Sequence, residues 1–161
     1  MGANSARFVT AINPGGSLLL LTEETMSEMH FHASATYPEE CCGLLVGVFE
    51  DNQRTKRVEE AMRMENVFQK EERYHRYSID PKEFLAVESA AESKALDVVG
   101  IYHSHPNAPA KPSQFDTARA WPSLSYVVME VRDSKPLETR SWILKEDRSE
   151  FVPEDMSVEK K

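Results

Sequence analysis

Residues 97–106 read Asp-Val-Val-Gly-Ile-Tyr-His-Ser-His-Pro, a β-branched run that ends in two histidines one residue apart. Such a run predicts a buried strand. Side chains at positions i and i+2 of a strand point the same way, so His103 and His105 are expected to face one side together. Their Cα atoms would lie roughly 6–7 Å apart, a span that two imidazoles can close on one metal ion. Pro106 is expected to end the strand, which puts the pair at the margin of the sheet.

A hydroxyl and a carboxylate follow shortly after the histidines. Ser113 and Asp116 are three positions apart, so on a helix they share one face. Asp116 would then be a third metal ligand, with Ser113 beside it. Two imidazoles and one carboxylate leave a fourth position for water, which is how catalytic zinc sites differ from structural ones. Ser-x-x-Asp also resembles a helix capping box. The two interpretations overlap, because Ser113 can begin the helix that carries Asp116.

Two further carboxylates stand just before another apolar run. Glu39 and Glu40 precede residues 41–49, which predict a second buried strand. A carboxylate at the mouth of an apolar strand is costly unless it is paired or functional. On the residues alone, a solvated turn between a helix and a strand explains both glutamates equally well.

The composition limits the class of protein. A chain of 161 residues with 40% hydrophobic and 29% charged residues fits one globular domain with its own core. A net charge of -8 argues against binding to nucleic acid, because a phosphate backbone demands clustered Lys and Arg. No apolar run has the length of a transmembrane helix, so no membrane association is expected. The N-terminus lacks the hydrophobic region of a secretory signal. A cytoplasmic location is expected, and the adjacent Cys41 and Cys42, too close to bridge, fit a reducing compartment.

Periodicity and turn residues predict the remaining elements. Strands are expected at residues 17–21, 41–49, 54–66, 74–79, 97–102, 126–131 and 139–144, with a last one near Phe151. Helices are expected from Thr22 to Tyr37, from Pro81 with Asp80 as its N-cap, and over residues 114–121. This mixture predicts an α/β (α+β) fold, in which a mixed, mostly antiparallel sheet is flanked by helices. Residues 1–16 are expected to form a flexible N-terminal arm, 17–154 the single domain, and 155–161 a frayed tail.

The combined pattern is more specific than any of its parts. Pro38-x-Glu40-x-x-Gly43 and an apolar run, followed later by His-x-His, seven residues and Ser-x-x-Asp, resembles the JAMM (JAB1/MPN/Mov34) metallopeptidase family. The resemblance runs from about Leu18 to Leu144 in the family's element order. It is closest to the short, stand-alone prokaryotic members, and it implies the cytidine-deaminase-like MPN/JAMM fold.

The resemblance also implies a role for each motif residue. Glu40 would be the general base that takes a proton from water and delivers it to the leaving amine. Ser113 would help to hold the oxyanion of the tetrahedral intermediate. One Zn2+ per chain would be bound, with water as the fourth ligand, by His103, His105 and Asp116.

The implied reaction is hydrolysis of a peptide or isopeptide bond after the C-terminal glycine of a ubiquitin-like or β-grasp sulfur-carrier protein ending in Gly-Gly. Two alternatives stay open. One is a non-catalytic MPN scaffold, and the other is a non-haem iron enzyme that uses the same two-histidine, one-carboxylate set.

Overall fold

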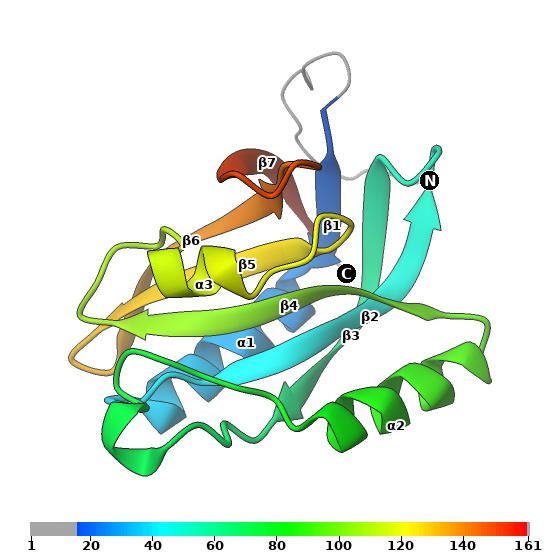
Figure 1. Cartoon of the computed structure of the whole chain (residues 1–161). Helices are drawn as coiled ribbons and strands as arrows, with labels where there is room; N and C mark the ends of the chain where they lie inside the picture. Colours follow the sequence, from blue (N-terminus) through cyan, green and yellow to red (C-terminus); the bar gives the residue numbers. More distant parts are fainter. Residues whose placement is uncertain (1–15, 161) are drawn as a thin grey trace.

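The computed structural model describes residues 16–160 of the chain (Figure 1). The arm expected over residues 1–16 therefore lies outside the described residues, apart from Gly16. The described part contains seven strands, three α-helices and one short 3-10 helix, which confirms the α+β class. In chain order these are β1 (Leu18–Thr22), α1 (Glu23–Thr36), β2 (Cys42–Glu50), β3 (Thr55–Met64), η1 (Lys70–Glu72), α2 (Pro81–Glu92), β4 (Asp97–Pro106), α3 (Gln114–Ala118), β5 (Ser125–Arg132), β6 (Lys135–Leu144) and β7 (Phe151–Glu159).

The seven strands form one mixed sheet in the order β1-β3-β2-β4-β5-β6-β7. Among the described strands, the pairs β1–β3, β1–β7 and β4–β5 are parallel. The other four pairs are antiparallel, so the sheet is mostly antiparallel, as the sequence predicts. Because β1 pairs on both of its edges, the sheet closes into a barrel. Closure removes the unpaired strand edges that an open sheet would leave.

The central strands are buried on both faces, which explains their nearly continuous apolar runs. Leu45 and Val127 belong to one core cluster, and the adjacent Leu44 and Val128 belong to the other. Helix α1 packs on the first cluster, whereas α2 and α3 lie on the opposite face of the sheet, beside β4 (Figure 1). Strand β4 is fixed by β2 on one side and by β5 on the other. The histidine-bearing strand is therefore held on both of its edges.

The strand predicted at residues 74–79 is wrong. These residues form a turn and an extended segment that leads into α2. The side chain of Asn66 makes the hydrogen bonds that a neighbouring strand would make. Its amide nitrogen donates to the carbonyls of Glu40 (3.1 Å) and Arg76 (3.0 Å). Its amide oxygen accepts from the backbone N–H groups of Phe68 and Ser78. One side chain thus satisfies backbone groups that a ladder would otherwise pair.

The frayed tail predicted over residues 155–161 is also wrong, because β7 runs to Glu159. The predicted boundary between the domain and the tail, at residue 154, falls inside β7. The stretch is polar, yet its backbone pairs with β1 and β6. Its buried carboxylate is paired: Lys56 lies 3.2 Å from Glu154 and Ser141 donates to it at 2.7 Å. Polar composition therefore does not imply disorder where a closing strand is needed.

Local signals set the helix starts as expected. Thr22 caps α1 by accepting from the N–H of Thr25 at 3.1 Å. Asp80 caps α2 by accepting from the N–H of Lys82 at 2.8 Å, with Pro81 next to it. None of the helices in the described part of the chain is long and apolar enough to cross a membrane.

Candidate metal centre

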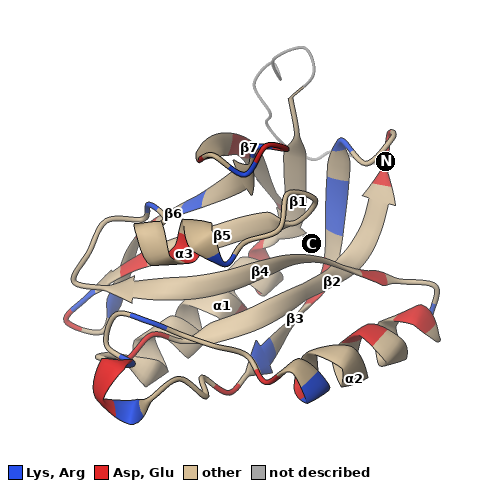
Figure 2. Ribbon diagram, in the orientation of Figure 1, with Lys and Arg blue, Asp and Glu red and all other residues tan. Residues whose placement is uncertain are grey.

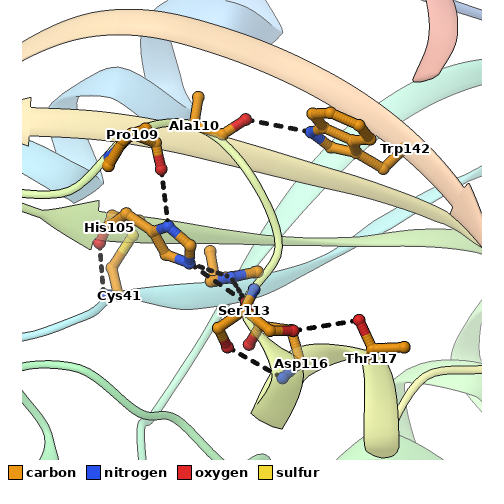
Figure 3. Close-up of polar contacts among 10 residues, drawn as sticks. Cys41, His105, Pro109, Ala110, Ser113, Asp116, Thr117 and Trp142 are labelled. Atoms are coloured by element: carbon orange, nitrogen blue, oxygen red, sulfur yellow. Dashed lines mark hydrogen bonds and ion pairs between the residues drawn. The ribbon is translucent and has the colours of Figure 1, made fainter. Parts of the chain in front are cut away.

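Three buried side chains from two elements meet near the end of β4. His103 and His105 come from the last residues of β4, and Asp116 comes from α3. Their exposed fractions are 1%, 7% and 9%. The loop between the two elements is anchored by the indole of Trp142, which donates to the carbonyl of Ala110 at 3.1 Å (Figure 3). The predicted ligand set is thus brought together in space.

The three candidate ligand atoms form a nearly equilateral triangle. The Nε2 atoms of His103 and His105 are 3.1 Å apart, and each lies 3.2 Å from Oδ2 of Asp116. Ligands of a tetrahedral zinc ion at about 2.0–2.1 Å stand about 3.3–3.4 Å from one another. These side chains therefore fit a tetrahedral ion that takes three protein ligands.

Neighbouring groups fix the orientation of both imidazoles. Nδ1 of His105 donates to the carbonyl of Pro109 at 2.8 Å (Figure 3), which leaves the lone pair of Nε2 facing the triangle. Nδ1 of His103 is buried and has no hydrogen-bond partner among the described residues. Instead, the ring of Tyr77 stacks on His103, with the ring centroids 4.6 Å apart.

The Asp116 carboxylate is held in its ionised form. Burial alone raises the pKa of Asp116, but its electrostatic interaction with His103, its contact with His105 and the hydrogen bond from the N–H of Ser113 lower the pKa and prevail. A full capping box is present at the start of α3: Asp116 N–H donates to Ser113 Oγ at 3.0 Å, and Ser113 N–H donates to Asp116 Oδ2 at 2.9 Å (Figure 3). The capping-box interpretation of Ser-x-x-Asp is therefore confirmed, and it leaves Asp116 placed beside both histidines.

Glu40 lies next to the triangle because β2 and β4 pair. In this pairing Cys42 lies opposite His103. One residue further along, the N–H of Ser104 donates to the carbonyl of Cys41. The same register places Glu40 beside His105. Glu40 is 3% exposed, and its Oε1 has no partner among the described residues. Burial, and then the negative charge of Asp116, raise the pKa of Glu40 to about 9.

Glu40, His105 and Ser113 line one cleft of about 380 Å³, and Asp116 lines a neighbouring cavity of about 160 Å³. Ser113 is exposed at the mouth of the cleft, so its hydroxyl is accessible from solvent. The cleft is lined by Glu40, Tyr74, His75, Arg76, His105, Pro106, Ala108, Ser113, Gln114 and Phe115. Glu39, the other glutamate considered, is not among the lining residues. Tyr77 and Arg76 were not predicted as parts of the site, because their segment carries no motif and was assigned to a strand.

The two cysteines take no part in this cleft. Cys41 and Cys42 are both buried and free. Burial raises the pKa of Cys41 to about 12, so its side chain stays a neutral thiol. They behave as small core residues.

The fold and the site together define a class of protein. Residues 22–145 match the family described as prokaryotic homologs of the JAB domain. The chain therefore belongs to this prokaryotic JAB (JAMM) family.

Individual relatives agree with that assignment. The chain is 36% identical over 107 residues to a desampylase of Haloferax volcanii, covering 66% of this chain and 73% of the relative. It is 32% identical over 126 residues to the CysO-cysteine peptidase of Mycobacterium tuberculosis, covering 78% and 82%. A solution structure of a Desulfitobacterium hafniense protein superposes with a TM-score of 0.76 at 32% identity, covering 89% of this chain and 94% of that one.

Proposed function

We propose that this protein is a zinc-dependent peptidase that hydrolyses a peptide or isopeptide bond after the C-terminal glycine of a ubiquitin-like or sulfur-carrier protein. The observation that carries the proposal is the triangle of ligand atoms beside the buried carboxylate of Glu40. Relatives named as a desampylase and a CysO-cysteine peptidase support the class of substrate.

The ligands of the proposed zinc ion are Nε2 of His103, Nε2 of His105 and Oδ2 of Asp116. When bound, zinc supplies Lewis acidity, which polarises a carbonyl and lowers the pKa of a water molecule to about 7. The protein contributes the orientation of the imidazoles, a negative ligand and ligand side chains that are buried.

Glu40 is proposed as the proton carrier. Burial raises the pKa of its carboxyl to about 9, so the carboxyl of the metal-free chain holds a proton near neutral pH. A divalent cation beside it would lower that pKa again, because the positive charge favours the carboxylate. Such a carboxyl can take a proton from water and deliver it to a leaving amine.

Ser113 is proposed as the donor to the oxyanion. Its Oγ already accepts from the N–H of Asp116 at 3.0 Å, which fixes the oxygen and leaves the hydroxyl hydrogen free to donate outward. Because Ser113 lies at the cleft wall together with Glu40 and His105, a carbonyl bound in the cleft would lie between the base and the donor.

The test combines metal analysis with an assay. The purified chain is expected to hold about one zinc ion and to cleave a fusion made after the Gly-Gly end of a β-grasp protein. A chelator should abolish cleavage, and zinc should restore it. A protein that binds no metal would support the scaffold alternative, and one that binds redox-active iron without cleaving the fusion would support the oxygenase-type alternative. Either result would overturn the proposal.

A further inference from the structure

Two arginines flank one aromatic ring at the wall of the cleft. The guanidinium of Arg76 lies over the ring of Phe115 at 4.4 Å, and that of Arg119 lies over the same ring at 4.9 Å. Phe115 follows Ser113 on α3, and Arg119 is the C-cap of this helix. Arg76 belongs to the segment between η1 and α2 that Asn66 holds in place. In this arginine pair (Arg76 and Arg119), Arg119 caps the helix that carries Asp116, and Arg76 lies on a segment that the side chain of Asn66 joins to the backbone of Glu40.

The arginine pair has no counter-ion among the residues that the structure describes. Neither guanidinium forms an ion pair with a carboxylate of the described residues, although the chain carries a net charge of -8. Arg119 has only a long hydrogen bond to the hydroxyl of Ser78, at 3.4 Å. Figure 2 marks basic positions along the loop that runs from η1 past the end of β4. Two like charges that share a ring in an acidic protein raise the local potential for an anion.

The two arginines reach different hollows. Arg76 lines the cleft of about 380 Å³ that also contains Glu40 and Ser113. Arg119 lines a neighbouring cavity of about 160 Å³, and Phe115 is the wall common to both. A planar guanidinium held against a ring is pre-organised to bind a carboxylate through two parallel hydrogen bonds. A carboxylate in the cleft would contact Arg76, with Arg119 adding charge from behind the ring.

We propose that the arginine pair is a carboxylate-binding subsite of the cleft, which selects substrates with a carboxylate close to the cleaved bond. This inference rests on the proposed peptidase function. The carboxylate has two possible sources: the α-carboxylate of a single residue attached after Gly-Gly, or an acidic side chain of the carrier near its end.

The test measures binding rather than turnover, with the zinc-loaded Glu40→Gln chain and fluorescent peptides containing Gly-Gly. One peptide has a free C-terminal acid one residue after Gly-Gly, the second has the carboxamide there, and the third has the carboxamide plus a glutamate before Gly-Gly. A peptide with a usable carboxylate should bind about tenfold more tightly than the neutral carboxamide. Preference for the first peptide assigns the α-carboxylate, and preference for the third assigns the carrier's side chain.

Substitutions decide whether the arginine pair is responsible. Arg76→Ala should remove the preference, Arg119→Ala should reduce it, and Arg76→Lys should restore it only in part because the planar fork is lost. Arg54→Ala is the matched control, since Arg54 is exposed at the turn between β2 and β3. Equal affinity for all three peptides, or a preference that survives Arg76→Ala, would overturn the inference. Failure of the peptidase proposal would show instead as absent cleavage by the unsubstituted chain.

Discussion

Ser113 and Asp116 hydrogen-bond to each other in both directions, and the Asp116 oxygen that accepts from Ser113 is also the one that lies 3.2 Å from both histidine nitrogens. The cap of a five-residue helix and the carboxylate of the candidate metal centre are therefore one structural unit. A helix this short is marginal alone, so its position depends on these bonds.

Substitution of Ser113 should affect both stability and turnover. Ser113→Ala removes the side-chain half of the capping box, which costs about 1 kcal/mol of unfolding free energy. It also removes the proposed oxyanion donor, which should lower kcat by about a hundredfold or more. Asp80→Ala is the control, because Asp80 caps α2 in the same way and lines no part of the cleft. Urea unfolding and steady-state kinetics on both variants separate the two effects; equal loss of kcat in both would contradict the assigned role.

The metal and the proton carrier should separate by substitution. His103→Ala should lose both zinc and hydrolysis, because the triangle loses one corner. Glu40→Gln keeps the shape of the side chain and touches no proposed ligand position, so it should retain about one zinc per chain while activity falls below detection. Elemental analysis beside the fusion-cleavage assay checks both. A Glu40→Gln chain with full activity would exclude Glu40 as the base.

The parts of the site that depend on spacing within one element could be predicted from the sequence. The i+2 relation of His103 and His105, and the i+3 relation of Ser113 and Asp116, are properties of a strand and a helix. Glu40 could be placed only through the family resemblance, because its position depends on the pairing of β2 with β4, a contact between residues some sixty positions apart.

The environment of the site could not be predicted in this way. Tyr77 reaches His103 because the side chain of Asn66, and not a strand ladder, holds the segment after η1. No periodicity in the sequence signals such a bond. Closure of the barrel by β7 could not be predicted either, because backbone pairing rather than an apolar pattern of side chains fixes that strand.

Gly43, the glycine of the Pro38-x-Glu40-x-x-Gly43 motif, has a packing role. A Cβ on Gly43 would lie 2.2 Å from the ring of Tyr102, whose hydroxyl hydrogen-bonds to Nδ1 of His32 at 2.7 Å. Gly43→Ala would force that buried ring to move, at a cost of about 1–3 kcal/mol of unfolding free energy. Tyr102→Phe loses the hydroxyl without moving the ring and should cost less. Thermal unfolding of the two variants tests this order, and a Gly43→Ala chain as stable as the original would refute the packing argument.

The stack of Tyr77 on His103 should tune metal affinity. The buried Nδ1 of His103 has no hydrogen-bond partner in the described part of the chain, so outside the triangle the ring of Tyr77 is a contact that restrains its imidazole. Tyr77→Ala should weaken zinc binding by about tenfold, in the range found for lost outer contacts of metal ligands. Tyr77→Phe preserves the ring and should bind zinc as the unsubstituted chain does. Competition with a chromophoric chelator measures both; equal weakening in both would assign the effect to the hydroxyl.

Glu40 should also make the stability of the metal-free protein depend on pH. Burial raises its pKa from 4.5 to about 9 in the folded state. Between these values the folded chain binds a proton at Glu40 that the unfolded chain has released, so stability is highest below the unfolded pKa and falls as pH rises toward about 9.

The Glu40→Gln variant has no proton to lose at this position. The free energy of unfolding of the variant, relative to the unsubstituted chain, should therefore increase steadily from pH 5 to pH 9. Urea unfolding with a chelator present measures the difference, in which the titration of the histidines largely cancels. Parallel pH profiles for the two chains would mean that the folded protein does not raise the pKa of this carboxyl, and with it the electrostatic case for Glu40 as a proton carrier would fail.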